Sequence, residues 1–484
     1  MGRDRAPTLA PPSSPAALRP PEDRPILVVG AGVSGLCAAL FLARRGFSVE
    51  LWESAAGPGG LLAPVEFRGV QCDLGSHRLH GESLPILRAA TSSLDWQLRP
   101  RRGALILRGR HIGYPLRLGG FLWGLGPLQA ARFGFGFLTR ESSLRKFTAW
   151  ERDRAAVEDS DDPGFEHFVR ERVGESAYQA FYRPYAEKVW GLPPGELSTV
   201  VAKKRISTAH PLTALRQGLQ RLGRPTTFAY PRLGMGGLTA ALVDEAQRAG
   251  VRFRFGQSTT ESDLTDPRWR HIVHSGHLRE LVRQAAPESL AGSGPELGQE
   301  LAHRGLYLVY LAVPGAALGP VDTYYAPEGC YWFGRVSVPR NFSPALAAAA
   351  LPGETALCVE IPEGRWGSER DFAREPALSE LTSQLVAARI LPPGTGPSAA
   401  HQIFLPSIYP LYRRGWLRSW RRSMQAVAAS GRIFPIGRQG LFLHCNIDHC
   451  VQIAADLTEH IAAGKSAAEW ARSSEQYLDL RVRD

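Results

Sequence analysis

The sequence predicts an α/β fold in which a nucleotide-binding βαβ domain is interleaved with a second, α+β domain. The chain has 484 residues and is 44% hydrophobic, which is enough for two or three domains with a sizeable core. Residues 26–29 form a short apolar run, typical of a strand buried on both faces, and lead directly into the glycine-rich residues 30–35. Residues 433–437 repeat this order of apolar strand and glycine turn, and a helical pattern follows.

The first glycine turn has the full pattern of a Rossmann-type dinucleotide site. Gly30 permits a tight turn, Gly32 allows the backbone to approach a pyrophosphate, and Gly35 lets the following helix pack against the strand. The N-H groups and the positive dipole end of that helix would face the phosphates. The next strand ends at Glu53, whose carboxylate can accept hydrogen bonds from both ribose hydroxyls of an adenosine. A turn that binds nothing is the alternative, but strand, glycines, helix and acid all occur in register.

A second glycine cluster, at residues 57–61, follows Glu53. Ordinary NAD folds do not need glycines at that place. Glu53 followed by this cluster resembles the N-terminal FAD-binding motif of the amine-oxidase and protoporphyrinogen-oxidase superfamily. The resemblance makes FAD the expected cofactor.

Charge and composition argue against several other classes of protein. The net charge is +11 and the pI about 9.6, which suits acidic partners, but the arginines are spread along the chain and no recognition motif occurs, so we expect no nucleic-acid partner. The six cysteines form no C-x-x-C pair, which favours a reducing, cytoplasmic location. Residues 1–24 are rich in proline and are expected to be a disordered leader. Residues 121–138 are apolar but interrupted by Pro, Gln and Arg, so we expect no transmembrane segment, with peripheral membrane contact as an alternative.

Residues 69–78 bring a histidine and an arginine to the end of a short strand-like run. Their order of Asp73, Gly75 and His77 resembles the D-x-G-G-H segment of a group of FAD proteins that includes UDP-galactopyranose mutase and protoporphyrinogen-oxidase-like relatives. In that group the backbone lies against the isoalloxazine ring and the histidine faces the flavin. Ser76 replaces the second glycine and adds a Cβ where the backbone would approach the ring. A histidine that only hydrogen-bonds inside a loop is the alternative for His77.

The second domain begins, on the same resemblance, after Tyr114 and Pro115, which lead into a helical segment beyond an acidic linker at residues 153–162. The run from Tyr185 to Gly191, Y-A-E-K-V-W-G, also resembles the mutase-like group. Its aromatic and cationic residues could stack on a ring and pair with a diphosphate, or they could form a packed helix end. Residues 306–313 read as a strand, and Arg335 follows aromatic residues that are expected in strands near the substrate. An anionic substrate is therefore conceivable.

Residues 433–450 contain a second strong motif. The pattern G-R-x-G at Gly437 and Arg438, followed by N-x-D-H at residues 446–449, resembles the FAD-closing motif of the mutase-like group. The N-terminal dipole of the following helix would stabilise negative charge at N1 and O2 of a reduced flavin. A metal site is the alternative, but the H-C-x-x-x-H-C spacing of residues 444–450 matches no standard zinc arrangement, so we expect no metal.

A second nucleotide site is not expected. Residues 234–237 are glycine-rich and begin a helix, but no buried strand is expected before them. Residues 251–255 alternate as a strand with one buried face. Without a second βαβ unit, electrons would come from an organic substrate and leave to oxygen or another acceptor.

Together these patterns predict an α/β, amine-oxidase-like architecture with a Rossmann-type FAD-binding domain interleaved with an α+β substrate domain. The expected FAD-binding domain comprises residues 25–120, 228–275 and 425–470, the substrate domain 121–227 and 276–424, and the tail 471–484. The candidate catalytic residues are His77, Arg78, Tyr185 and Arg335. The candidate FAD-binding residues are Gly30, Gly32, Ser34, Gly35, Glu53, Gly59, Gly60, Leu61, Gly75, Ser76, His77, Val251, Gly437, Arg438, Asn446, Asp448 and His449.

Three functions follow from the resemblance. The first is an FAD-dependent oxidoreductase in which a small organic substrate gives a hydride to flavin N5. The second is a UDP-galactopyranose-mutase-like isomerase, in which N5 of reduced flavin bonds to the anomeric carbon of a nucleotide sugar and arginines hold its diphosphate. The third is a protein that binds FAD for structure only. We rank the oxidoreductase first from sequence, because the diphosphate-binding arginines cannot be assigned residue by residue. The substrate, the electron acceptor and the oligomeric state are not predicted.

Overall fold

The computed structural model describes residues 24–79, 84–114, 162–205, 226–285, 297–348, 352–364 and 370–482. The apolar stretch 121–138 lies outside these ranges, as do all but the last residue of the expected leader and all but the last residue of the acidic linker. Within them, no helix is both long and apolar enough to cross a bilayer.

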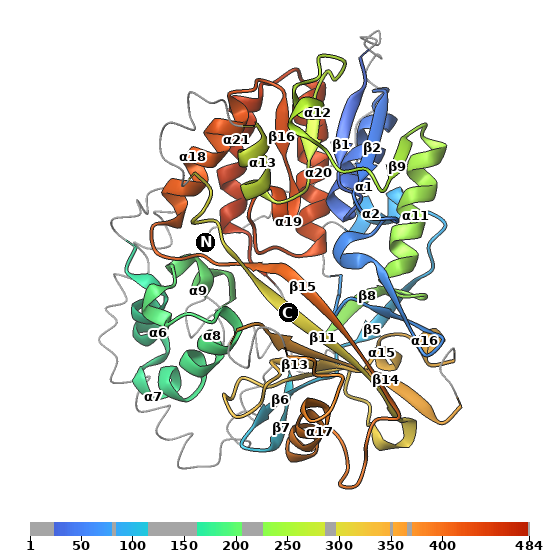
Figure 1. Cartoon of the computed structure of the whole chain (residues 1–484), viewed down its shortest axis with the longest axis vertical. Helices are drawn as coiled ribbons and strands as arrows, with labels where there is room; N and C mark the ends of the chain where they lie inside the picture. Colours follow the sequence, from blue (N-terminus) through green and yellow to red (C-terminus); the bar gives the residue numbers. More distant parts are fainter. Residues whose placement is uncertain are drawn as a thin grey trace, which may run out of the picture.

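A parallel five-stranded sheet forms the nucleotide-binding half, with strand order β16-β10-β1-β2-β9 (Figure 1). Its strands are β1 (Ile26–Val29), β2 (Val49–Glu53), β9 (Arg252–Phe255), β10 (Ile272–His274) and β16 (Ile433–Pro435). β1, β10 and β16 are almost wholly buried because helices cover both faces of the sheet, as a parallel sheet requires. The predicted Rossmann-type fold is confirmed.

Helices from distant parts of the chain cover this sheet. α1 (Val33–Arg44) packs against both α11 (Met235–Arg248) and α20 (Ile447–Ala462), and α18 (Trp416–Ala428) packs against α13 (Leu278–Ala285) and α21 (Ala467–Ser473). Leu36 and Leu40 on α1 and Leu457 on α20 are fully buried in one large core. The N-terminal and C-terminal segments therefore build a single domain.

A mixed seven-stranded sheet forms the other half, with strand order β15-β11-β14-β13-β12-β6-β7. Its strands are β6 (Gly103–Leu107), β7 (Arg110–Tyr114), β11 (His303–Pro314), β12 (Thr323–Tyr325), β13 (Arg335–Ser337), β14 (Glu354–Pro362) and β15 (Ala399–Pro410). Neighbouring strands are antiparallel except β12 and β6. Helix α17 (Ala377–Ala387) packs through Leu381 and Leu385 on a second core that this sheet forms. Figure 1 shows this sheet below the nucleotide-binding half, with the long strands β11 and β15 running between the two.

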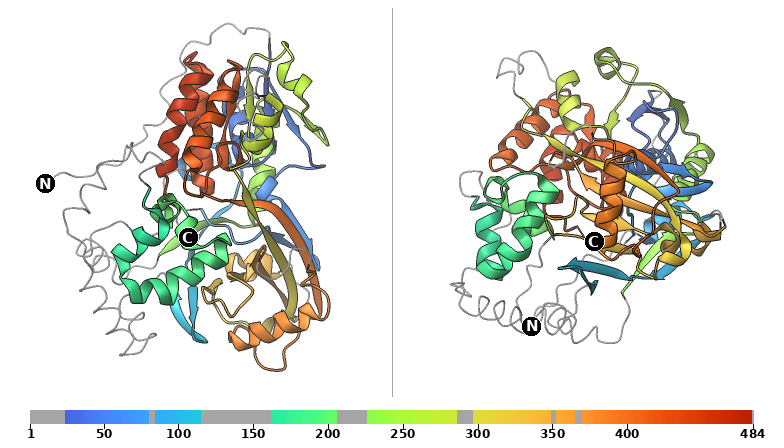
Figure 2. Two further views of the ribbon diagram at one scale, coloured as in Figure 1. Left: turned by 60° about the vertical axis from the view of Figure 1, so that its left-hand side comes forward. Right: turned by 60° about the horizontal axis from the view of Figure 1, so that its bottom comes forward.

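A group of helices stands beside the two sheets, as both views in Figure 2 show. It contains α6 (Gly164–Val173), α7 (Glu175–Ala177), a π-helical turn (Tyr178–Tyr182), α8 (Arg183–Trp190) and α9 (Thr199–Arg205). Two short antiparallel pairs, β3 (Pro64–Phe67) with β4 (Val70–Asp73) and β5 (Trp96–Pro100) with β8 (Thr227–Pro231), lie between the halves. The remaining short helices are α2 (Leu84–Ala90), α12 (Glu261–Thr265), α15 (Pro339–Phe342), α16 (Pro344–Ala348) and α19 (Gly437–Gly440).

One local expectation holds in part and another is wrong. Of the alternating apolar residues at 251–255, Val251 is buried and Phe253 packs against the core, but Phe255 is exposed, so the predicted buried face is limited to the start of β9. A buried strand, β8, does precede residues 234–237. It pairs antiparallel with β5 outside the parallel sheet, so this glycine turn still does not belong to a second βαβ unit.

The domain boundaries stay a prediction, but three segments lie elsewhere than expected. Residues 103–114, placed in the FAD-binding domain, form β6 and β7 of the seven-stranded sheet. Helix α13, placed in the substrate domain, packs against α18 and α19 in the nucleotide-binding half. Residues 474–479, expected in a tail, form a 3-10 helix whose Tyr477 is buried.

Candidate functional site

The turn between β1 and α1 is built as its glycines predict. A Cβ on Gly35 would lie 1.9 Å from the carbonyl oxygen of Gly30, so only glycine allows the helix to sit this close to the strand. At Gly32, the N-cap of α1, no described atom lies within 4 Å of the Cβ position. Among the described residues no side chain caps α1, so its first N-H groups are available to an anion.

The second glycine cluster lies directly against the first. The Gly59 N-H donates to the Ala31 carbonyl over 2.9 Å, and Gly32 and Gly59 form a parallel bridge. Glu53 is held at the same place, because its Oε2 accepts from the Ala31 N-H over 2.7 Å and its Oε1 from the Ala55 N-H over 2.8 Å. Gly60 stacks on this turn, with its Cβ position 3.3 Å from the Gly32 Cα, and Leu61 follows in a short 3-10 helix. The acid and both glycine clusters therefore form one surface at the carboxyl ends of β1 and β2.

The C-terminal motif, which follows β16 at the edge of the same sheet, reaches the same turn. A Cβ on Gly437 would lie 2.2 Å from the Ser34 hydroxyl oxygen, so the start of α19 is in close contact with α1. Arg438 is fixed by carbonyl groups: its Nη2 donates to Ile408 over 2.8 Å and its Nη1 to Cys445 over 2.9 Å. The two glycine turns, some 400 residues apart in sequence, are thus neighbours in the fold.

The residues of the N-x-D-H pattern begin helix α20. The N-cap Asn446 donates its N-H to Nδ1 of His449 over 3.1 Å, as the third residue of a capping box does. Asp448 is buried in the first helical turn, where an acid suits the helix dipole. Val251 lies apart from these residues, buried between α11 and β9.

His77 lies in a loop that follows β4. Its Nε2 is 2.9 Å from the Leu74 carbonyl oxygen, which can only accept, so the ring carries its hydrogen on Nε2. Burial lowers the pKa of His77, and Arg335 and Arg438 lower it further, although Asp73 opposes them. His77 is therefore a neutral imidazole near neutral pH, close to two fixed cations.

Asp73, at the end of β4, is a half-buried residue that sequence reasoning did not single out as functional. Its Oδ1 accepts from the Met235 N-H over 2.9 Å, at the N-terminus of α11, and its Oδ2 from the Tyr230 hydroxyl over 2.6 Å. Burial raises the pKa of Asp73, while His77, Tyr230 and the Met235 N-H oppose the rise. Asp73 thus joins the His77 loop to α11.

A row of polar residues crosses the seven-stranded sheet beneath this loop. Tyr325, Arg335 and Glu360 are direct cross-strand partners on β12, β13 and β14. Arg335 is paired with Glu360 through Nε at 2.8 Å and Nη2 at 2.7 Å, and Glu360 also accepts from the Ser76 N-H over 3.1 Å. Burial by itself would lower the pKa of Arg335, but Glu360 raises it well above its ordinary value. The Arg335 side chain is 24% exposed and that of Glu360 3%, so Arg335 is the member that can meet a ligand.

Arg78 is buried beside the Tyr325 end of this row. Its Nη2 donates to Asp322 over 2.6 Å, and its guanidinium lies over the rings of Phe228 and Phe342. The Arg78 and Asp322 side chains are only 5% and 2% exposed. Arg78 therefore has a structural ion pair in a buried position.

The hydroxyl group of Tyr325 receives two cationic donors. Nη1 of Arg78 is 3.3 Å and Nη2 of Arg101 is 3.2 Å from its oxygen. Because both donate to the oxygen, the hydroxyl hydrogen of Tyr325 can be given to another acceptor. From sequence, Tyr325 was expected only as one of the aromatic residues in strands near the substrate, and Glu360 was not expected. An isolated acid in the apolar run of β14 was the one signal that could have revealed Glu360.

Tyr185 lies on α8 in a stack of aromatic rings. The rings of Phe181 and Tyr185 are nearly parallel, with centroids 6.1 Å apart, and Phe181 packs on the small cluster that contains Tyr325. The buried Lys188 ties α8 to the loop between β12 and β13, donating to the carbonyls of Ala326 over 2.8 Å and Phe333 over 3.0 Å. The aromatic stack is therefore fixed relative to the polar row.

The cysteines and histidines of residues 444–450 do not converge on one point. Among the described residues no group of three or more His, Cys, Asp or Glu side chains is arranged to hold a metal ion. The ring of His444 instead contacts Trp190 and Tyr409 edge-on. Cys445 and Cys450 lie together, with their sulfur atoms 3.7 Å apart.

Buried histidines near this motif predict acid sensitivity. Burial lowers the pKa of His274 to about 4 and, together with His277 and Arg438, that of His303 to about 3. The unfolded chain would protonate these rings near a pKa of about 6.5. Because the unfolded state then binds more protons, stability is full above about pH 6.5 and falls as the pH is lowered toward 4.

Thermal unfolding recorded from about pH 7.5 down to about pH 4.5 should therefore show a falling Tm. His303→Gln should make that fall shallower, because the variant lacks one of the buried histidines whose pKa is lowered. An unchanged pH profile in His303→Gln would contradict this explanation.

A family model for the NAD(P)-binding Rossmann-like domain matches residues 28–91. A zeta-carotene-forming phytoene desaturase of Myxococcus xanthus is 48% identical over 54 residues, which are 11% of this chain and 10% of the desaturase. A probable UDP-galactopyranose mutase of Klebsiella pneumoniae is 23% identical over 184 residues, which are 37% of this chain and 44% of the mutase. The chain thus matches less than half the length of each of these relatives.

Solved structures match the whole fold. Reduced UDP-galactopyranose mutase superposes with a TM-score of 0.75 at 19% identity, over 95% of this chain and all of the mutase. A putative protoporphyrinogen oxidase from Exiguobacterium superposes with a TM-score of 0.65 at 17% identity, over 91% and 99%. Putrescine oxidase bound to putrescine gives 0.59 at 14% identity, over 92% and 100%. Residues 28–91 therefore match an NAD(P)-binding Rossmann-like domain, and the chain has the fold of the amine-oxidase-like structures, with a parallel Rossmann-like sheet and a second, mixed sheet.

Proposed function

We propose that this protein is a flavin-dependent enzyme that binds FAD along its two adjacent glycine turns. The fit is supported by the start of α1, which among the described residues has no side-chain cap, and by the open space at Gly32. This turn would hold the pyrophosphate, and Glu53 would accept hydrogen bonds from the ribose hydroxyls. The His77 loop and the start of α20 would flank the ring system.

A bound flavin supplies N5, which accepts a hydride when the ring is oxidised and acts as a nucleophile when it is reduced. The residues of this chain would bind and orient the substrate. Arg335, held by Glu360, offers a fixed positive charge to an anionic group. The Tyr325 hydroxyl would donate a hydrogen bond to the substrate. Because His77 is neutral, the positive charge nearby would come from Arg335 and Arg438.

We favour isomerisation of a nucleotide sugar, and the observation that carries this choice is the link from Arg335 through Glu360 to Ser76. This link fixes the Arg335 guanidinium beside the loop that is expected to face the flavin. The diphosphate of a nucleotide sugar would need a positive charge at that place. The stacked Phe181 and Tyr185 rings would suit a flat nucleobase. The sequence match to the mutase also extends well beyond the dinucleotide motif, whereas the desaturase match covers 54 residues. These observations reverse the ranking made from sequence.

Net oxidation of an organic substrate is the second candidate. The strand before residues 234–237 lies outside the parallel sheet, so this turn provides no second dinucleotide site of Rossmann type. A mutase that works with reduced flavin needs a reductant, whereas an oxidase takes its electrons from its own substrate. This observation favours the oxidoreductase.

One pair of anaerobic assays separates the two. Protein reduced with dithionite is offered UDP-galactopyranose and UDP-galactofuranose, and oxidised protein is screened with amines, porphyrinogens and polyenes for loss of flavin absorbance. Interconversion of the two sugars without net oxidation supports the mutase. Bleaching by an organic donor, with no sugar turnover, supports the oxidoreductase.

Arg335→Gln should weaken binding of UDP-galactose by about 10- to 100-fold, because a hydrogen bond to a charged group contributes about 1.5–3 kcal/mol. Glu360→Gln is introduced with it, so that no buried carboxylate is left without a partner. Arg335→Lys should keep part of the affinity, because the charge remains. Flavin content and calorimetric binding are measured on all variants. Equal affinity in wild type and the double variant would contradict a role for Arg335 in substrate binding.

A further inference from the structure

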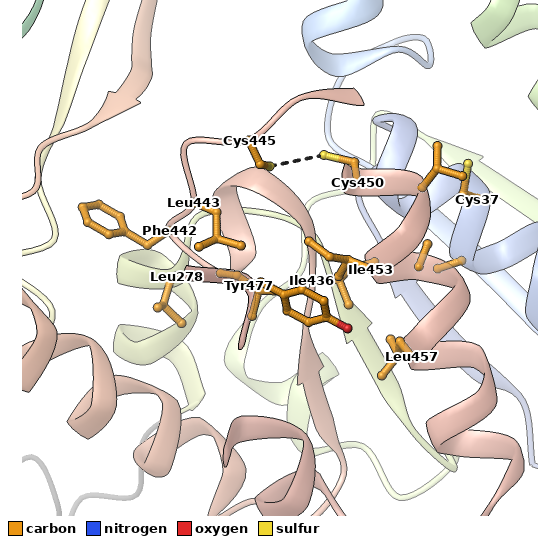
Figure 3. Packing of buried hydrophobic residues seen from close by; sticks show 14 of the residues in the cluster. Cys37, Leu278, Ile436, Phe442, Leu443, Cys445, Cys450, Ile453, Leu457 and Tyr477 are labelled. Atoms are coloured by element: carbon orange, nitrogen blue, oxygen red, sulfur yellow. Dashed lines mark hydrogen bonds between the residues drawn. The ribbon is translucent and has the colours of Figure 1, made fainter. Parts of the chain in front are cut away.

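Two cysteines flank the start of helix α20. Cys445 immediately precedes the N-cap Asn446, and Cys450 lies one turn into the helix. Their sulfur atoms are 3.7 Å apart and point toward one another (Figure 3). Both side chains lie in the core and each residue is only 5% exposed. Apolar residues at these two positions commonly pack together as a hydrophobic staple, but thiols placed so can also react with one another.

The surroundings of the two thiols differ. The thiol of Cys445, the Ser34 hydroxyl and the Arg438 guanidinium favour the thiolate of Cys450 over the opposing effect of burial, and its pKa falls to about 7. The same contact with Cys450, together with burial, raises the pKa of Cys445 well above its ordinary value. One member of the pair can thus act as a nucleophile while its neighbour stays protonated, as in reactive dithiols.

We propose that Cys445 and Cys450 form a reversible disulfide when the protein meets a two-electron oxidant such as hydrogen peroxide. The Cys450 thiolate attacks one peroxide oxygen, forming a sulfenic acid and releasing the other oxygen as water after protonation. The sulfur of Cys445 then attacks the sulfenic sulfur, loses its proton and releases a second water. The two thiols together lose two electrons and two protons, and hydrogen peroxide accepts them. A dithiol reductant reverses the reaction by thiol–disulfide exchange.

Disulfide formation would alter the turn that closes the expected FAD site. The two sulfur atoms must move from 3.7 Å to about 2.05 Å apart. Cys445 carries the carbonyl that fixes Arg438, and Cys450 lies against Ser34 at the start of α1. Closing the bond therefore shifts residues that contact both glycine turns. The effect on FAD rests on the proposed function, whereas the disulfide itself rests only on the thiol geometry.

Peptide mapping tests the disulfide directly. FAD-loaded, full-length protein carrying Cys330→Ser, which removes the exposed cysteine, is treated with hydrogen peroxide, blocked with N-ethylmaleimide and digested with trypsin without reduction. Cleavage after Arg438 and Lys465 releases residues 439–465, which contain both cysteines and no others. We expect this peptide to be two hydrogens lighter and unlabelled, and to gain two labels after dithiothreitol.

Three matched variants locate the bond. Cys445→Ser and Cys450→Ser should each abolish the mass change, whereas Cys37→Ser, on the neighbouring helix α1, should retain it. Unoxidised thiols after peroxide treatment, or a cross-link between Cys37 and Cys450, would overturn the proposal. Loss of the disulfide from the Cys37→Ser protein would do the same.

Flavin binding tests the consequence. Oxidation of the pair should change the FAD dissociation constant by about threefold or more, and dithiothreitol should restore it. If the disulfide forms but the FAD affinity does not change, the disulfide itself is supported and its effect on the cofactor is refuted. Should the protein bind no FAD at all, the proposed function fails, and the same mapping on flavin-free protein still decides whether the disulfide forms.

Discussion

Gly32→Ala should lower FAD affinity by about 100-fold or more, equivalent to about 3 kcal/mol, while leaving the fold intact. The backbone of Gly32 has φ −72° and ψ 174°, which alanine adopts without strain, and no described atom lies within 4 Å of the new Cβ. The methyl group would stand where a pyrophosphate approaches the backbone. The loss of affinity therefore comes from a clash with the ligand and not from a clash within the protein.

Gly35→Ala is the matched contrast. Its Cβ would lie 1.9 Å from the Gly30 carbonyl oxygen, a backbone atom that cannot move aside, so we expect a loss of about 3 kcal/mol or more in unfolding free energy, at the upper end of overpacking effects. Denaturant unfolding and FAD titration separate the two variants. Gly113→Ala serves as the control, because Gly113 lies on β7, outside both glycine clusters, and is exposed with nothing within 4 Å of the new Cβ. Normal FAD affinity in Gly32→Ala would disprove a phosphate site at this turn.

Arg78→Met should destabilise the protein by about 3–5 kcal/mol, because it leaves the carboxylate of Asp322 buried without its cation. The Asp322 side chain is 2% exposed, and water cannot replace the guanidinium there. Adding Asp322→Asn removes the uncompensated charge and can still accept a hydrogen bond from the Arg102 N-H, so the double variant should recover much of the loss.

Urea unfolding of the two single variants and the double variant measures this coupling. A side chain that acted only on substrate would affect turnover while leaving the unfolding free energy unchanged. Equal stability of wild type and Arg78→Met would therefore restore Arg78 as a catalytic candidate.

The βαβ unit could be predicted from the sequence because the residues that define it lie close together in the chain. The turn glycines, the helix and Glu53 are fixed by spacing within one short stretch, and the structure has them in that arrangement. The contact between this unit and residues 437–449 lies across the whole chain. It could be expected only from the family resemblance, because no local pattern specifies which distant turn will meet the first.

The polar row on the seven-stranded sheet could not be found in the same way. Tyr325, Arg335 and Glu360 come together only through the register of three strands. The sequence also could not place neighbouring side chains, because Arg78 is adjacent to His77 in the chain but has different surroundings in the fold. His77 stays beside Arg335, whereas Arg78 is buried between Phe228 and Phe342.

The long strands β11 and β15 have a mechanical consequence. The β15 carbonyls of Ser407 and Ile408 accept hydrogen bonds from Gln439 and Arg438 of the C-terminal glycine turn, and β15 pairs with β11 on both sides of this point, along the edge of the seven-stranded sheet. Strands β11 and β15 therefore form a rigid connection between the two halves of the molecule. On the proposed function, cofactor and substrate surfaces joined in this way would keep a set separation, and a substrate would be accommodated by local adjustment instead of a hinge between the two halves.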